Sequence, residues 1–365
     1  MNMDFESFVN EMKDHIKEFL PERFADATVE VRQNTKLNET YTALVVQEEG
    51  QTITPSINLN QLYEAYDKGE VSLEMSLMRT AHLIGAEPLN IDISKLLDYD
   101  QAKENLFIRV SAAEANKEML ATAPHKLMED LAITYHIAAD IGSDAVASTM
   151  VTDPMLESFG ISQEQLHADA LANSTKLFPA QVQSMGEVMR KMISQDMAAT
   201  GMSQDDIDMM MDSMGLDVSN PMTVVSNDRG INGAAVMFYP GQMDQIGDRL
   251  GGDFFILPSS VHEMLVIPDD GNFQYQDLQS MVADVNETQV AETDRLTDEV
   301  YHYDTEERVF EKAATFEDRQ KQKEQNLAKG KDMEIGASGA KADKVAEHAQ
   351  QAAHKPKHKS NDMSL

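Results

Sequence analysis

The spacing of apolar residues changes repeatedly along this chain, between the two-residue period of a strand and the three- and four-residue period of a helix. The strand-like runs of the first hundred residues lie around 29–31, 41–46 and 53–57, and the helical runs at 5–20, 59–66 and 71–84. The three strand-like runs predict a β-meander. Elements this short and closely spaced suit hairpins better than the long crossovers of a parallel sheet. The pattern therefore predicts an α+β fold with mainly antiparallel sheets and packed helices.

One combination of signals occurs twice, at 131–160 and 222–252. Each stretch has two strand-like runs, then a proline, a helix and a closing glycine. The strand-like runs are 131–137 and 145–151 in the first stretch, and 222–226 and 234–239 in the second. This suggests a duplicated hairpin-helix unit, although α+β domains also reuse such units without common descent. Further strands are predicted at 106–110, 253–257, 261–267 and 300–303.

We divide the chain into three parts: 1–100 with the first helix, meander and following helices, 101–304 as an α+β domain with both hairpin-proline-helix units, and 305–365 as a tail. Apolar periodicity fades in the tail, which ends in a lysine-rich segment. A segment with so little apolar surface cannot offset its ordering entropy. The tail is therefore predicted to be mostly disordered, with a frayed helix before Ala328 as an option.

Charge is distributed unevenly. The chain has 63 acidic and 30 basic residues, a net charge of −33. Residues 1–310 carry −35, and the remainder carries +2. The large negative charge of residues 1–310 repels phosphate backbones, which argues against direct nucleic-acid binding by the folded part. An acidic surface that aids solubility, one that engages a basic protein partner, and one that imitates nucleic acid all remain open.

Other features bear on location. The sequence has no Cys, which excludes disulfides and thiolate metal sites. No run approaches the roughly 18–20 apolar residues of a membrane-spanning helix, and the first residues do not resemble a secretory signal. We expect a cytoplasmic protein that does not bind membranes.

Motifs of known chemistry are missing. There is no phosphate-binding loop, dinucleotide fingerprint, nucleophile elbow or calcium loop. His262-Glu263 begins like a zinc protease helix, but Val266 stands where the second His is required. We expect no metal and no cofactor.

The strongest candidate for catalysis is the turn at 258–263. Ser260 and His262 fall on one face of a strand, so they are the candidate catalytic pair. Ser259 and Glu263 are candidate binding residues. The alternative is a turn whose hydroxyls satisfy local backbone groups, with His262 in a structural role.

The polar loop 227–233 supplies the other binding candidates, Asn227, Asp228 and Arg229. Asn, Asp and Gly also suit an ordinary hairpin turn, which explains the loop without function.

The segment 185–214 has two further features. Asp205, Asp208 and Asp212 share a helical face, which is more typical of a solvated face than of a cation site. Methionine accounts for 25 residues, and nine of them fall in this segment: Met185, Met189, Met192, Met197, Met202, Met209, Met210, Met211 and Met214. Flexible thioethers suit either an adaptable partner surface or a helix core.

The stretch from Val224 to Asp269 resembles an uncharacterised family of Firmicutes proteins, a domain of unknown function. The resemblance is carried by Val224–Asn227, Gly233–Gly241 and, most distinctively, Leu250–Glu263. Met150–Thr152, Phe159–Ser162 and Leu166–Asn173 are similar to the middle of that family, and the resemblance covers most of residues 4–304. It implies no catalytic or binding residue.

These observations favour a non-enzymatic intracellular binding protein with an acidic surface and an unknown protein partner. One alternative is an enzyme of unrecognised class that uses the 227–233 and 258–263 loops. Another is an acidic nucleic-acid mimic.

Overall fold

The computed structural model describes residues 2–49, 55–86, 96–142, 146–203, 205–207, 209–210 and 221–326. Contacts divide the chain into two units, Met1–Phe310 and Glu311–Leu365. The domain boundaries that we predict after residues 100 and 304 stay predictions.

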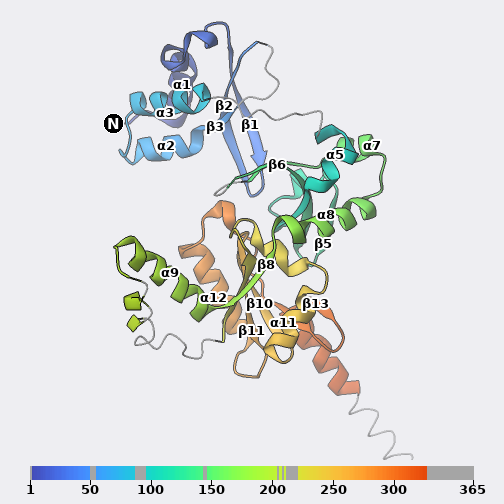
Figure 1. Ribbon diagram of the computed structural model, residues 1–365. Coiled ribbons are helices and arrows are strands. Elements are labelled where there is room, and N and C mark those ends of the chain that lie inside the picture. Colours follow the sequence, from blue (N-terminus) through green and yellow to red (C-terminus); the bar gives the residue numbers. More distant parts are fainter. Residues whose placement is uncertain are drawn as a thin grey trace, which may run out of the picture. The chain divides into compact units, whose positions relative to one another are not determined.

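The N-terminal elements pack three helices against one antiparallel sheet (Figure 1). They are α1 (Phe5–Phe19), β1 (Thr28–Lys36), β2 (Glu39–Gln47), β3 (Ser56–Asn58), α2 (Leu59–Asp67) and α3 (Leu73–Gly85). The strand order β1-β2-β3 confirms the predicted meander. Asp4 caps α1 by accepting a hydrogen bond from the Ser7 N–H at 2.8 Å. Phe8, Met12 and Ile16, four residues apart, are fully buried, as the helical spacing predicts.

A second sheet is centred on one long strand. Its members are β4 (Leu106–Ala112), β5 (His125–Met128), β6 (Leu131–Ile141) and β7 (Val146–Met150). β4 pairs with one edge of β6, while β5 and β7 pair with successive stretches of β6, all antiparallel. Helix α7 (Asp153–Phe159) follows β7 and ends at Gly160, which has φ +66°. The first predicted hairpin-helix unit is therefore confirmed.

The third sheet has six strands in the order β13-β12-β10-β11-β9-β8. They are β8 (Ala180–Ser184), β9 (Thr223–Asn227), β10 (Phe254–Ser260), β11 (Glu263–Pro268), β12 (Tyr301–Asp304) and β13 (Val309–Lys312). The pairings of β8 with β9, β9 with β11, β11 with β10 and β10 with β12 are all antiparallel. Together the three sheets confirm the predicted α+β class.

The second predicted hairpin is wrong. Residues 234–239 do not form a strand; residues 234–238 belong to a 3₁₀ helix, η3 (Gly233–Phe238), and Tyr239 is its C-cap. Ala234, Ala235, Val236 and Met237 are buried, and periodicity cannot distinguish a buried strand from a buried helical turn in so short an apolar run. The stretch 222–252 therefore contains no duplicate of the first unit, and β9 pairs instead with β8 and β11.

Element η3 contributes to a core that the second and third sheets share. Ile133 and Tyr135 from β6 join Val236 from η3 and Ile256 from β10 in one buried cluster. Gly233 opens η3 at a point where a Cβ atom would lie 2.1 Å from Ser226 Oγ and 2.5 Å from the His262 carbonyl oxygen. Only glycine permits this approach, which brings the 227–233 loop against the turn between β10 and β11.

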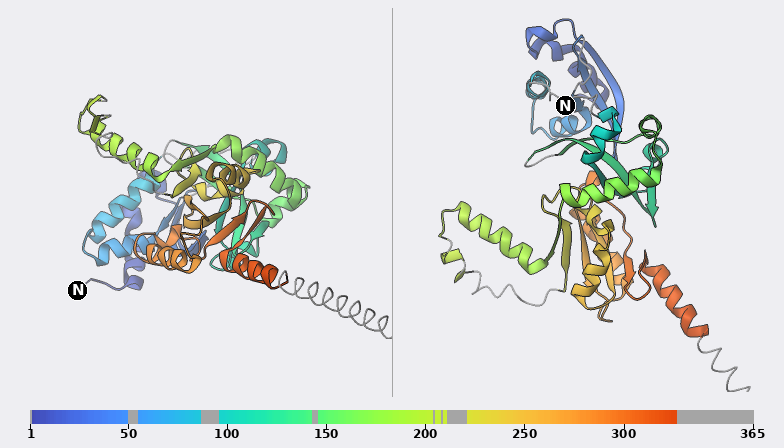
Figure 2. Two further views of the ribbon diagram at one scale, coloured as in Figure 1. Left: turned by 90° about the horizontal axis from the view of Figure 1, so that it is seen from below. Right: turned by 45° about the vertical axis from the view of Figure 1, so that its right-hand side comes forward.

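Among the described residues of the first unit, the longer helices after the second sheet begins are α8 (Gln163–Leu177), α9 (Met185–Ala199), α11 (Gln242–Leu250) and α12 (Tyr275–Thr288), and α5 (Tyr99–Ala102) and α6 (Lys117–Leu120) are single turns. Helix α8 packs on β4, and α12 packs on β10. Helix α9 instead extends away from the third sheet in both views of Figure 2 and buries none of its residues.

The first part of the predicted tail contains a helix, at the place where the sequence allows one before Ala328. In the second unit residues 313–326 are helical, and Arg319 Nε donates to Glu311 Oε1 at 2.8 Å. Local ion pairs of this kind support a helix that has little apolar periodicity. Residues 327–365 lie outside the described part of the chain.

Candidate functional site

A cavity of about 810 Å³ lies against one face of the second sheet. The face is contributed by β4, β6 and β7. The remaining walls come from the turn between β1 and β2, from Asn232, from the β10–β11 turn and from residues 293–294. The cavity therefore gathers side chains from widely separated parts of the sequence.

Arg109 is the principal charged group on the sheet face. The register sets Arg109 opposite Thr134 and Phe107 opposite His136, so alternation places Phe107, Arg109 and His136 on the same face. Arg109 Nη2 donates to Ser148 Oγ on β7 at 2.8 Å, and the guanidinium carbon lies 5.4 Å from the centre of the Phe107 ring. Its Nε atom is buried and has no hydrogen-bond partner in the described part of the chain.

Burial governs the electrostatics of Arg109. Desolvation lowers the pKa of Arg109 to about 10, and no acidic group among the described residues offsets this effect. A buried cation usually has a carboxylate partner. Arg109 instead contributes an uncompensated positive charge to the wall of a cavity.

His136 stands beside this charge as a neutral group. It is only 4% exposed, and its Nε2 lies 3.0 Å from Thr134 Oγ1. Burial and the neighbouring Arg109 charge hold the pKa of His136 well below its ordinary value. The imidazole is therefore uncharged at neutral pH and does not compete with Arg109 for an anion.

Asn38 fixes the wall that the β1–β2 turn provides. Its φ of +61° allows the tight turn, and its N–H donates to Asn116 Oδ1 at 2.7 Å. Asn38 Nδ2 donates to the carbonyl oxygens of Thr293 and Arg295 at 3.0 and 2.8 Å. Asn116 Nδ2 in turn donates to Asn38 Oδ1 at 2.6 Å. These bonds position Thr35, Lys36, Leu37 and Glu39 along the cavity.

The 227–233 and 258–263 loops meet at this cavity, which Asn232, Val261 and His262 all line. The backbone N–H of Asn232 donates to His262 Nδ1 at 3.2 Å. With Nδ1 as the acceptor, the Nε2 atom of His262 is the ring donor, and it lies 3.7 Å from Asp294 Oδ1.

Ser260, the other half of the candidate catalytic pair, is placed differently. Its Oγ accepts a hydrogen bond from the backbone N–H of His262 at 3.1 Å, as the structural alternative predicts for a turn hydroxyl. Ser259 Oγ donates to Glu263 Oε1 at 3.4 Å, and Ser259 lines a separate small apolar pocket beside α12. Of these four residues, only His262 lines the large cavity.

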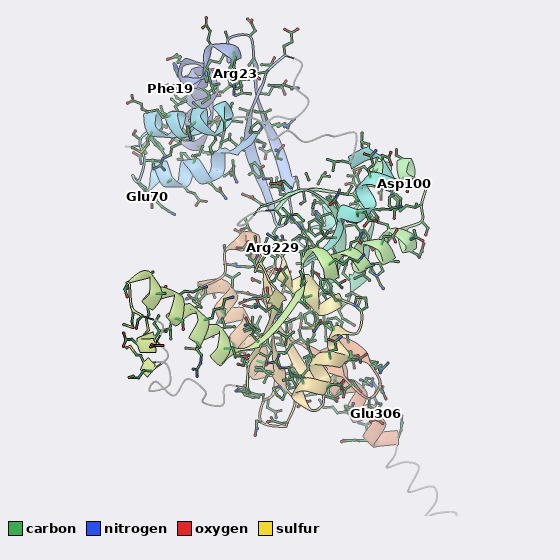
Figure 3. All side chains as sticks on the ribbon, viewed as in Figure 1. Phe19, Arg23, Glu70, Asp100, Arg229 and Glu306 are labelled. Atoms are coloured by element: carbon green, nitrogen blue, oxygen red, sulfur yellow. The ribbon has the colours of Figure 1, made fainter. Side chains whose placement is uncertain are left out.

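The three candidates of the 227–233 loop have local contacts. Asn227 Oδ1 accepts from the Arg229 N–H at 3.0 Å, and Asn227 Nδ2 donates to the Ile231 carbonyl oxygen at 2.8 Å. Asp228 is exposed. Arg229, labelled in Figure 3, donates from Nη1 to the Gly142 carbonyl oxygen at 2.6 Å and so joins this loop to the end of β6.

The aspartate row of 205–212 is only partly described, since Asp208 and Asp212 lie outside the described residues. Within the described ranges, no group of three or more His, Asp or Glu side chains is placed to hold a metal ion. The same ranges contain no helix that could cross a membrane, by length and hydropathy together.

Arg109, Asn38 and Asp294 are site residues that sequence reasoning missed. For Arg109 a signal exists, because it is a lone charge inside the buried run Leu106–Val110. Asn38 and Asp294 give no such signal, because their roles depend on partners far away in the sequence.

Comparisons with known proteins identify the family without a function. No curated protein and no solved structure matches the chain. A family model described as a family of unknown function, DUF5688, matches residues 5–305. This match confirms the resemblance to a domain of unknown function, and the chain belongs to the DUF5688 family.

Proposed function

We propose that this protein binds a small molecule with an anionic group, which Arg109 holds in the large cavity. The observation that carries the proposal is the buried guanidinium with a free Nε donor and no carboxylate partner among the described residues. The planar guanidinium matches an anion with two oxygens. An unsatisfied buried donor costs about 1–3 kcal/mol, which a bound anion recovers.

Binding fits the cavity better than turnover does. A general base needs a nitrogen with a free lone pair, and His262 Nδ1 already accepts the Asn232 N–H. Ser260 Oγ accepts the backbone N–H of His262 and does not line the cavity. The enzyme alternative predicts that a Ser260→Ala/His262→Gln double variant loses a turnover found in the parent protein. The binding proposal predicts that ligand is recovered unchanged from both proteins.

The direct test is calorimetric titration with small carboxylates and with inorganic phosphate. Saturable binding of at least one class supports the proposal. We expect Arg109→Gln to weaken it by about 10- to 100-fold, since hydrogen bonds to a charged group contribute about 1.5–3 kcal/mol. The matched control is Arg32→Gln, an exposed arginine on β1 outside the cavity. Equal binding by both variants, or no binding by the parent, contradicts the proposal.

A second proposal, a protein partner for α9, rests on the exposure of that helix. Met189 and Met192 are 43% and 60% exposed, and α9 buries no residue. The net charge of −35 on residues 1–310 favours a basic partner. We expect a co-purifying partner to slow amide hydrogen exchange in Met185–Ala199 but not in β10. Unchanged exchange in α9 contradicts this second proposal.

We place the protein in the cytoplasm, a proposal that the absence of Cys supports. Purification from lysate with and without nuclease distinguishes a direct protein partner from the nucleic-acid mimic. A mimic collects many nucleic-acid-binding proteins, which salt releases.

A further inference from the structure

The charges that the described residues bring to the cavity are balanced. Among these residues, two basic side chains, Lys36 and Arg109, and two acidic side chains, Glu39 and Asp294, contribute to the walls. With His136 kept neutral by burial, the formal charges of these four side chains cancel. A cavity of this kind favours a ligand with no net charge over a multiply charged anion.

Two of the four charges have other contacts. Glu39 accepts a hydrogen bond from the Asn58 amide. The Lys36 ammonium lies 5.3 Å from the centre of the Tyr41 ring, in cation–π range. Arg109 and Asp294 have contacts too, but Arg109 keeps an Nε donor without a partner among the described residues, and the Asp294 side chain is 38% exposed. We therefore assign these two charges to the ligand.

Arg109 and Asp294 do not pair with each other. Among the described residues, Arg109 has no carboxylate within ion-pairing distance, although Asp294 lines the same cavity. The carboxylate of Asp294 is 38% exposed, and its nearest basic group is His262 Nε2 at 3.7 Å. Two opposite charges thus face one cavity from different walls, Arg109 from β4 and Asp294 from the segment before Arg295.

His262 helps to keep the Asp294 carboxylate in place. Because Nδ1 accepts the Asn232 N–H, the Nε2 donor of the ring is on the side of Asp294. The Asp294 carbonyl oxygen also accepts the Val261 N–H at 2.8 Å, which ties its backbone to the β10–β11 turn. Asp294 is therefore anchored as an acceptor and has room for a further donor.

We propose that the ligand is an amino carboxylate, with its carboxylate on Arg109 and its ammonium group on Asp294. This inference rests on the proposed function and specifies the chemical class of the ligand. An ammonium carboxylate is neutral overall, as the balanced walls require. A phosphate monoester with an ammonium group keeps a net negative charge and suits this cavity less well.

The test compares ligands that differ only in the ammonium group. The parent protein is titrated at about pH 7 with the ω-amino carboxylates from glycine to 8-aminooctanoate, and with the unbranched carboxylates of the same lengths. We expect one or two chain lengths at which the amino carboxylate binds about three- to tenfold more tightly than its partner, the range of a partly exposed ion pair.

Variants test whether the Asp294 carboxylate causes this difference in affinity between amino carboxylates and simple carboxylates. Asp294→Asn should abolish the advantage of the amino carboxylate and leave the simple carboxylate unaffected, while Arg109→Gln should weaken both. Asp294→Glu should keep the advantage and move it to a shorter ligand. Asp248→Asn, at an exposed aspartate of α11 outside the cavity, is the matched control and should change nothing.

Two results overturn the reasoning at different points. If simple carboxylates bind through Arg109 with no advantage for any amino carboxylate, the ligand class is wrong and the proposed function stands. If neither carboxylates nor inorganic phosphate bind the parent protein, the proposed function itself fails.

Discussion

Replacing Arg109 by methionine should stabilise the ligand-free protein while removing its ability to bind an anion. Burial lowers the pKa of Arg109 to about 10, well below its ordinary value. At about 1.4 kcal/mol for each pKa unit, burying the charge costs about 3–4 kcal/mol. Because the pKa is lowered in the folded state, the unfolded chain holds this proton more tightly, so the cost is fully present below about pH 10 and disappears as the pH rises above that value.

The substitution also removes favourable contacts. The hydrogen bond to Ser148 contributes about 1 kcal/mol, and the contact with the Phe107 ring contributes about 1 kcal/mol. The net expectation for Arg109→Met is a gain of about 1–2 kcal/mol in the free energy of unfolding. Methionine fills much of the same volume and leaves no buried polar group on its own side chain.

Urea unfolding followed by circular dichroism at about pH 7 measures this quantity. Arg32→Met, at an exposed position, is the control and should stay within about 0.5 kcal/mol of the parent. A loss of more than about 2 kcal/mol in Arg109→Met refutes the reasoning, because it means that the guanidinium supports the fold and is not held there for a ligand.

Three further perturbations test the fold around the cavity. Gly233→Ala should lower the free energy of unfolding by about 3 kcal/mol, because its Cβ meets backbone atoms. Gly230→Ala, with φ +66° and open space, should cost only about 1 kcal/mol, and equal losses would contradict the steric account. Asn38→Gly preserves the turn but removes the hydrogen bonds of the Asn38 side chain. It should lower the free energy of unfolding by about 2 kcal/mol and weaken ligand binding in calorimetry. Unchanged affinity would show that the β1–β2 turn does not contribute to the binding site. The pKa of His136 is lowered in the folded state, so the unfolded chain takes up more protons and stability should fall as the pH drops below about 6.5. His136→Asn should make the free energy of unfolding depend less on pH between about pH 7 and 5. If the free energies of variant and parent fall in parallel, His136 is not the group that causes the decline.

Local sequence patterns determined much of the fold. The spacing of Phe8, Met12 and Ile16 is enough to specify the buried face of α1, because helical periodicity acts within one element. The strand pairs β1–β2 and β10–β11 follow from alternation and from turn residues close in sequence. The prediction of a strand at 234–239 is wrong because a short run in which every residue is apolar shows neither the two-residue nor the 3.6-residue period.

The candidate site depended far more on tertiary structure. The sequence indicated the 227–233 and 258–263 loops as candidate sites, and the two loops are in contact in the structure. The residues of the first loop that make this contact are Asn232 and Gly233, which were not among the predicted site residues. Ser260 and His262, paired by alternation alone, are separated by the turn geometry, in which Ser260 Oγ caps a backbone N–H.

The sequence by itself determined an acidic α+β chain of antiparallel hairpins and amphipathic helices, because charge and periodicity are local properties. Only the tertiary structure decided that Arg109, Asn38 and Asp294, which lie up to 256 positions apart, line or close one cavity. The free energy of such a site comes from burial and from partners brought together by folding, and neither is encoded in the spacing of neighbouring residues.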